Sequence, residues 1–207
     1  LYEKAGLLLA ELDNLKREVV DSGHGIGGPV SIGVSTTCET RLLTMLPELH
    51  GKYPEIRFRL AVADSSLLEK DIRNRDLDIA ILLLPLEAAE EYEVRHLPPE
   101  GFSVVFGPSL DVPEQESFSL DDLLGWPLLL SRRWGGGGSY EAIMSYWQRK
   151  NASPQVLLDS HNIHTLLRLV ELGMPAVAVS PGREITETVR RILRVRPLTG
   201  PDPRLLP

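Results

Sequence analysis

The stretch "VSIGVSTTCET", residues 30–40, sets the interpretation of this chain. Apolar residues alternate over 30–34, which predicts a strand with one buried face. Four small hydroxyl or thiol residues follow at 35–38, and Glu39 then opens a leucine-rich stretch with helical spacing. A strand that passes into a helix through a polar turn is typical of α/β sheets, whose ligands bind beyond the carboxyl ends of the strands.

The polar turn has two interpretations, and the residues leave both open. Thr36 and Glu39 have the spacing of a capping box, in which side chains satisfy the first N–H groups of a helix. Ser35, Thr36 and Thr37 could instead contact a ligand, because a helix N-terminus offers N–H donors and a partial positive charge. That environment suits a small carboxylate.

The residues that follow repeat the strand and helix pattern. Residues 56–62 alternate as a second strand, and Ser66 with Glu69 has capping-box spacing at the start of another helix. The run "LDIAILLLP", residues 77–85, is almost continuously apolar, which predicts a strand buried on both faces. This alternation predicts a parallel sheet flanked by helices.

The second half has the same pattern and offers further polar strand ends. Strands are expected over 102–106, 127–130, 156–158, 176–179 and 192–195. Ser131 and Arg132 follow one of them, and either Arg132 or Arg133 could pair with a carboxylate. His161 follows another, as a ligand contact or a surface residue, with Asp159 or Ser160 as the expected helix cap. Residues 135–138 are four glycines, which predict a mobile loop.

The first twenty residues have the apolar spacing of a heptad helix, and a glycine-rich linker follows at 21–29. The helix could pack on its own domain or pair with a second copy. The net charge of −7 excludes a surface that is basic throughout, as a nucleic-acid footprint would be. The single cysteine, Cys38, excludes an intrachain disulfide framework and a multi-cysteine metal site. No apolar run is long enough to cross a bilayer.

The order of several motifs resembles the effector-binding domain of LysR-type transcriptional regulators, from about residue 1 to 197. The first half carries Ile32-Gly33, Leu46-Pro47, Tyr53-Pro54-Glu55, Ser65-Ser66 and Leu77-Asp78-Ile79-Ala80 in the family's order. The stretch "LLRLVELGMPAVAVSP" matches a later motif of the family at Val170, Gly173 and Pro181. Met174-Pro175 departs from that motif, and the apolar turn at 82–84 favours an effector with an apolar part.

The resemblance implies an α/β fold of two Rossmann-like lobes with a cleft between them, similar to type 2 periplasmic binding proteins. It implies a linker or dimerisation helix over 1–22, a first lobe from 29–100 and about 182–207, and a second lobe over 101–181. The helix-turn-helix DNA-binding domain is expected to lie outside this chain, as are the family's final strand and helix.

The resemblance further implies a ligand-sensing regulatory domain in the cytoplasm. A small effector, a carboxylate with an apolar part, would bind between the lobes and relay a change to the DNA-binding domain. Copies would form a homodimer or homotetramer, without a membrane contact. The expected effector contacts are Ser35, Thr36, Thr37, Ser131, Arg132 and His161.

Two other classes of protein compete with this interpretation. A solute receptor would share the two-lobe architecture, but a heptad helix stands where an export signal would be expected. An enzyme would need a nucleophile and a base in reach, for which Cys38 and His161 are the candidates. Cys38 is more simply a small apolar residue in the first turn of the helix. No catalytic set, cofactor or metal is therefore expected.

Overall fold

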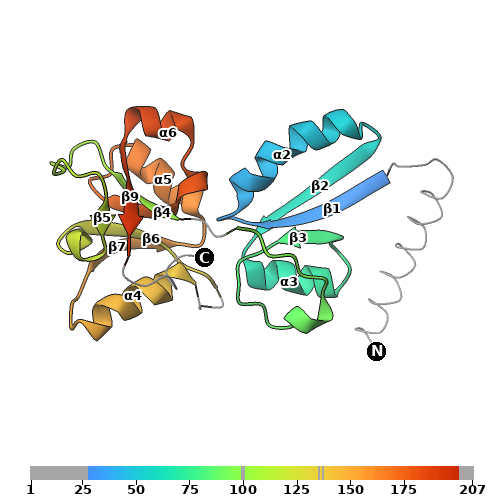
Figure 1. The fold of residues 1–207 in the computed structure, drawn as a ribbon, viewed down its shortest axis with the longest axis horizontal. Helices are drawn as coiled ribbons and strands as arrows, with labels where there is room; N and C mark the ends of the chain where they lie inside the picture. The colour runs from blue at the N-terminus through green and yellow to red at the C-terminus, as the bar shows by residue number, and fades with distance from the viewer. Residues whose placement is uncertain (1–27, 99–100, 135, 137, 201–207) are drawn as a thin grey trace. The chain divides into compact units, whose positions relative to one another are not determined.

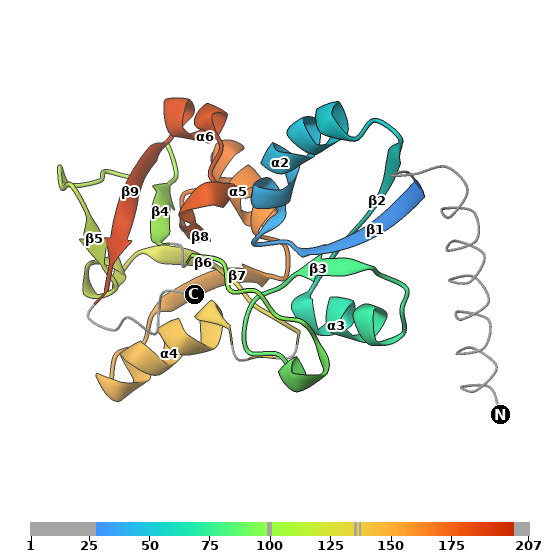
Figure 2. The same cartoon turned by 45° about the vertical axis from the view of Figure 1, so that its right-hand side comes forward.

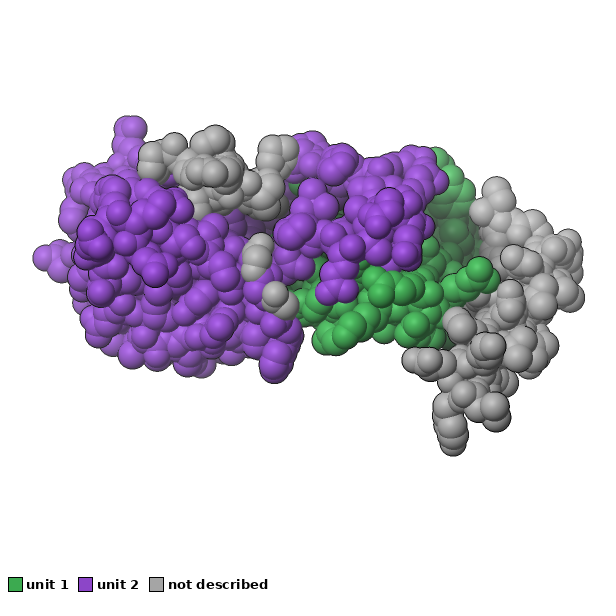
Figure 3. All heavy atoms as spheres, turned by 90° about the horizontal axis from the view of Figure 1, so that it is seen from below, with its two compact units in different colours: residues 1–82 green, residues 83–207 purple. Residues whose placement is uncertain are grey.

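The computed structural model describes residues 28–98, 101–134, 136 and 138–200. The chain divides into two compact units, residues 1–82 and residues 83–207, which Figure 3 colours green and purple. Figure 1 labels their helices and strands. The helix expected over 1–22 lies outside the described residues, as do two of the four loop glycines. Each unit is an α/β structure in its own right.

The first unit contains a three-stranded parallel sheet in the order β2-β1-β3, which confirms the predicted parallel pairing. Its elements are β1 (Gly28–Ser35), α2 (Glu39–Lys52), β2 (Ile56–Ala63), α3 (Ser65–Arg73) and β3 (Ile79–Ile81). Figure 2 shows α2 and α3 on opposite faces of this sheet. Each strand therefore has its carboxyl end at the same edge.

Alternation along β1 assigns its side chains to the two helices. Ile32 and Val34 pack with Leu42 of α2 on one face. Gly33 faces α3, where a Cβ would lie 3.1 Å from Leu68 and closer still to Leu77. A larger residue here would force the ends of the Leu68 and Leu77 side chains to move, because both approach the strand backbone.

The apolar run at 77–85 forms less strand than predicted. Only Ile79–Ile81 pairs, with β1 alone, and Ile79 is 54% exposed. The prediction of burial on both faces was wrong because β3 has a single neighbour among the described strands. Asp78 sets the pairing: its carboxylate accepts from Ser31 N at 2.7 Å, and its own N–H donates to Ser31 O at 2.9 Å.

The cap of α3 also differs from the prediction. Asp64 is the N-cap, and its Oδ1 accepts from Ser66 N at 3.0 Å and from Ser66 Oγ at 2.9 Å. The helix thus begins one residue before Ser66, which donates to the cap rather than serving as one. An aspartate caps a helix at least as well as a serine does, and it stood two positions upstream.

The second unit contains a mixed six-stranded sheet in the order β5-β9-β4-β8-β6-β7. Its strands are β4 (Phe102–Phe106), β5 (Phe118–Ser119), β6 (Pro127–Ser131), β7 (Gln155–Ser160), β8 (Val177–Pro181) and β9 (Arg194–Thr199). Its α-helices are α4 (Ser139–Arg149), α5 (Ile163–Glu171) and α6 (Glu187–Ile192), with 3-10 turns η1 (Ala89–Glu91), η2 (Asp121–Leu123) and η3 (Gly182–Glu184). Strand β4 runs antiparallel to β8 and β9.

Two apolar clusters hold this sheet, one on each face. Val104 and Phe106 of β4 pack in the same cluster as Trp147 of α4. Val105, the residue between them, packs with α5 and α6 instead. Strands β6 and β8 alternate in the same way. Fully buried strands carry apolar residues at every position, which explains why these strands showed no alternation in the sequence.

The structure corrects the predicted assignment of the C-terminal segment. Residues from about 182 onward were expected to return to the first lobe, but β9 pairs with β4 and β5 in the second sheet. The boundary between the compact units also falls after residue 82 rather than residue 100. Helix α6 was not predicted, because its six residues are too few to show a clear helical period.

Candidate functional site

The polar turn of the first unit closes at the carboxyl end of β1. Ser35 is the last residue of the strand and is buried, and its Oγ lies 3.4 Å from Thr37 Oγ1. The backbone N–H of Cys38 donates to Ser35 O at 2.8 Å, so residues 35–38 form a tight turn. The structure thus brings Ser35 and Thr37 together, with Thr36 half-buried between them.

Helix α2 begins directly after this turn, and its start corrects two expectations. Its N-cap is Cys38, whose side chain makes no capping hydrogen bond. The N-cap position expected for Thr36 is taken by Cys38, because the turn places Thr36 two residues before the cap. Cys38 stands just before the first helical turn rather than within it, and it packs against the cluster of Ile32, Val34 and Leu42.

A neighbouring turn lies at the same edge of the sheet. Ser35 pairs in register with Ala63 at the end of β2, and the chain continues there into Asp64 and the buried Ser65. Sequence reasoning treated these residues only as a helix start. The signal that could have found them is the parallel pairing itself, since it aligns the carboxyl ends of adjacent strands.

In the second unit, the predicted residues meet where β6 and β7 end. Ser131 pairs in register with Ser160, and Arg132 N donates to Ser160 O at 3.0 Å. His161 follows β7, and its Nδ1 lies 2.6 Å from Arg132 O. Because a carbonyl oxygen only accepts, this hydrogen bond requires a proton on Nδ1. Ser131, Arg132 and His161 thus form one local group.

Arg132 and its neighbour Arg133 lie in different surroundings. The Arg132 guanidinium is 3.9 Å from Glu141 Oε1, 4.0 Å from Asp159 Oδ2 and 5.1 Å from the centre of the Tyr140 ring. These contacts hold Arg132 at the start of α4. Arg133 donates from Nη1 to Leu84 O at 3.2 Å, and its buried Nε meets no acceptor among the described residues.

The N-cap predicted for α5 was wrong, and the stacking of Trp134 was not predicted. The cap of α5 is Asn162, which accepts from His164 N at 2.9 Å, whereas Asp159 and Ser160 belong to β7. The expected cap was wrong because the strand extends two residues further than its apolar core. Trp134 was not considered, yet its ring stacks on His161 with centroids 3.9 Å apart and planes at 15°.

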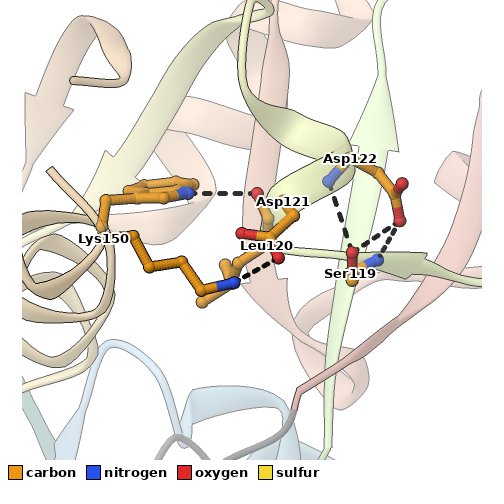
Figure 4. A network of polar contacts seen from close by, with 6 residues as sticks. Ser119, Leu120, Asp121, Asp122 and Lys150 are labelled. Atoms are coloured by element: carbon orange, nitrogen blue, oxygen red, sulfur yellow. Dashed lines mark hydrogen bonds and ion pairs between the residues drawn. The ribbon is translucent and has the colours of Figure 1, made fainter. Parts of the chain in front are cut away.

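A separate polar cluster lies at η2 and the end of α4, and Figure 4 shows it. Lys150 Nζ lies 2.5 Å from Asp121 Oδ2, and Trp147 Nε1 donates to Leu120 O at 3.2 Å. Ser119 donates from both its N–H and its hydroxyl to Asp122 Oδ2 at 2.7 Å. The first two contacts join η2 to the end of α4, and the Ser119 contacts hold the start of η2.

The hydrogen bonds of this cluster lower the pKa of both aspartates. The Lys150 ammonium lowers the pKa of Asp121, and the Ser119 hydroxyl and N–H lower the pKa of Asp122. A carboxyl group whose pKa is lower in the folded than in the unfolded protein stabilises the folded state at pH values above the unfolded pKa. That contribution is lost as the pH falls through the folded pKa.

We expect Asp122→Asn to reduce the pH dependence of the free energy of unfolding under acidic conditions. The second unit of the unmodified chain should lose stability as the pH falls below about 4. The variant should lose less over the same interval, because its side chain no longer titrates. Urea unfolding followed by tryptophan fluorescence measures this, since all three tryptophans lie in the second unit. Asp111→Asn, at an exposed acid, is the control, and equal slopes for Asp122→Asn and the unmodified chain would contradict the prediction.

The described residues contain neither a metal site nor a membrane-spanning helix. Residues 28–98, 101–134, 136 and 138–200 contain no group of three or more His, Cys, Asp or Glu side chains that could hold a metal ion. Within these same ranges, no helix is long and apolar enough to span a membrane.

Comparison with known proteins identifies the family. The model of the LysR substrate binding domain matches residues 23–207. The chain belongs to this family. The regulator BsdA of Bacillus subtilis is 22% identical over 174 residues, which are 84% of this LysR-family chain and 60% of BsdA. The regulator OxyR of Escherichia coli is 26% identical over 212 residues, covering 99% of the chain and 66% of OxyR.

A solved structure supports the fold of this LysR-family domain. The regulatory domain of CcmR from Synechocystis superposes with a TM-score of 0.65 at 18% identity, over 84% of this chain and 81% of that one. The fold is thus the two-lobe, type 2 periplasmic-binding-protein-like fold that the resemblance implied. The chain spans about three fifths of the length of BsdA.

Proposed function

We propose that this chain is the effector-sensing domain of a LysR-type transcriptional regulator and that its effector is a small carboxylate. The observation that carries the proposal is the polar turn of Ser35, Thr36 and Thr37, placed between the end of a parallel strand and the start of a 14-residue helix. The N-terminus of such a helix attracts anions through its N–H groups and its dipole.

The second unit offers a matching set of polar groups at Ser131, Arg132 and His161. We propose that these residues also contact the effector. We further predict that one effector molecule contacts both this set and the polar turn of the first unit. The CcmR regulatory domain, which has the same fold, was solved in complex with 2-PG. A small ligand is therefore consistent with this fold.

The wider activity is proposed from the family. BsdA and OxyR are named as transcriptional regulators. We propose that this domain likewise acts in the cytoplasm, without enzymatic activity, as a homodimer or homotetramer. It would relay effector binding to a helix-turn-helix domain that contacts DNA. A ligand can shift such an equilibrium only through a difference in affinity for the two states.

A disulfide-based redox switch within this segment is chemically excluded. Some relatives are named as hydrogen peroxide-inducible activators. An intrachain disulfide needs two cysteines, and these 207 residues contain only Cys38. Effector binding through polar contacts is therefore the better-supported means of control.

Replacing Thr37 with Val tests the proposal. The unmodified chain is first screened against a panel of small carboxylates and phosphorylated acids by thermal unfolding. A ligand at a hundredfold excess over its Kd should stabilise the chain by about 2.7 kcal/mol. Thr37→Val should lose most of that stabilisation while its midpoint without ligand stays unchanged, because Thr37 is a half-buried turn residue.

Thr44→Val is the matched control. Thr44 lies on the exposed side of the same helix, and its hydroxyl bonds to Arg41 O at 2.9 Å. This variant should keep the full response to ligand. If Thr37→Val instead lowered the unfolding midpoint without ligand as much as it lowered the ligand-induced stabilisation, the turn would have a structural role. If no compound of the panel stabilised the unmodified chain, effector binding would be refuted.

A further inference from the structure

Trp134 is an exposed aromatic side chain at the centre of the polar group in the second unit. It lies three residues after the end of β6, and 69% of its surface is accessible. Another indole of this unit, that of Trp147, is completely buried and donates its N–H to Leu120 O. An exposed tryptophan leaves a large, flat apolar surface available for contact with another ring.

The ring of Trp134 is held in place rather than loose. It stacks on His161, with a centroid separation of 3.9 Å and planes within 15° of parallel. His161 is itself fixed by the 2.6 Å hydrogen bond from Nδ1 to Arg132 O, at the point where β6 and β7 end. The two rings therefore form a preorganised flat wall, whose support comes from two adjacent strands.

The surroundings of this wall suit a small ligand better than a protein partner. The described residues near Trp134 and His161 in the sequence are polar or small: Ser131, Arg132, Gly136, Gly138 and Ser160. Protein-docking patches combine several exposed apolar side chains into a continuous surface. Here one large ring stands within a polar rim, an arrangement in which aromatic area gives affinity and a few polar groups give orientation.

We infer that Trp134, supported by His161, is a stacking platform for a flat conjugated ring in the effector. The inference rests on the proposed function and narrows its ligand class to planar ring acids. Stacking on an indole gives stabilisation beyond the burial of apolar area, and only a planar partner can use the whole face. A saturated ring of similar size and charge is puckered and makes fewer contacts with the same wall.

Matched acids that differ only in planarity test this inference on the 207-residue chain. The probes are benzoate against cyclohexanecarboxylate and trans-cinnamate against 3-cyclohexylpropanoate. We expect at least one planar acid to bind about tenfold more tightly than its saturated partner, which corresponds to about 1.4 kcal/mol. Its binding should also quench tryptophan fluorescence.

Variants at the same position separate stacking from simple apolar contact. Trp134→Leu should weaken binding of the planar acid about tenfold and leave the saturated acid unchanged, whereas Trp134→Phe should retain part of the preference. Trp126→Phe is the matched control: Trp126 packs edge-on against Phe106, at 5.9 Å, and should not affect the quenching. The midpoint of Trp134→Leu without ligand reports whether the variant folds.

Each outcome has a distinct meaning. Equal affinities for planar and saturated acids, or unchanged affinity in Trp134→Leu, would overturn the stacking platform while the effector-sensing function stood. If neither these probes nor the wider acid panel stabilised the unmodified chain, both the inference and the proposed function would fall.

Discussion

Trp147→Ala is expected to destabilise the second unit by about 3–5 kcal/mol, the usual cost of removing a large aromatic side chain from a core. Trp147 is fully buried between α4 and the sheet, in one cluster with Phe106 and Leu128. Domains of this kind are stable by only about 5–15 kcal/mol, so the loss would bring the unit close to unfolding at room temperature. Urea unfolding followed by circular dichroism measures it.

Trp147→Phe keeps the experiment informative if the alanine variant does not fold. Phenylalanine retains most of the apolar volume but removes the N–H that donates to Leu120 O. Leu120 O still accepts from Leu123 N at 3.1 Å, so the loss of this one hydrogen bond should cost only about 0.5–1.5 kcal/mol. A loss below 1 kcal/mol for Trp147→Ala would show that the cluster around α4 contributes little to stability.

Gly107→Ala is expected to cost about 3 kcal/mol or more, for a different reason. A Cβ on Gly107 would overlap the backbone carbonyl of Met174 and lie 3.2 Å from both Ala176 N and Ala176 O. Gly107 N also donates to Ala176 O, which fixes the two segments together. Backbone atoms cannot rotate away as a side chain can, so the strain must separate β4 from the segment that leads into β8.

Gly101→Ala is the matched control for this substitution. Gly101 lies at the other end of β4, and a Cβ there would meet no described atom within 4 Å. Its free energy of unfolding, measured in urea, should stay within about 0.5 kcal/mol of the value for the unmodified chain. A Gly107→Ala variant as stable as Gly101→Ala would contradict the close approach of Gly107 to Met174.

The sequence was most informative where local pattern and tertiary role coincide. The period-two alternation of β1, the parallel pairing of the first sheet and the cores of β4, β6, β7 and β8 were predicted correctly. The run at 77–85 misled because its apolar residues indicate burial but not how many strands pair with it. The position of β9 could not be predicted either, since pairing with β4 is a long-range contact that no local pattern records.

The candidate site shows the same division. The sequence placed Ser131 and His161 at the ends of two predicted strands. These strands, β6 and β7, are adjacent and parallel, and His161 lies beside Arg132 where they end. The stacking of Trp134 on His161 was not predictable, because it depends on the path of the chain after β6. The competing N-caps at Cys38 and Asn162 depend on where each strand stops, which composition leaves undetermined to within a few residues.

The clip between Asp78 and Ser31 makes one amide a natural reporter of the first unit. The Ser31 N–H donates to the carboxylate of Asp78, which lies in the connection between α3 and β3, rather than to the backbone of a neighbouring strand. Its exchange with deuterated solvent therefore requires the segment around residue 78 to detach, even while the pairing of β1 with β2 persists. The rate at which this single hydrogen exchanges reads out the local opening of the unit, without any added probe.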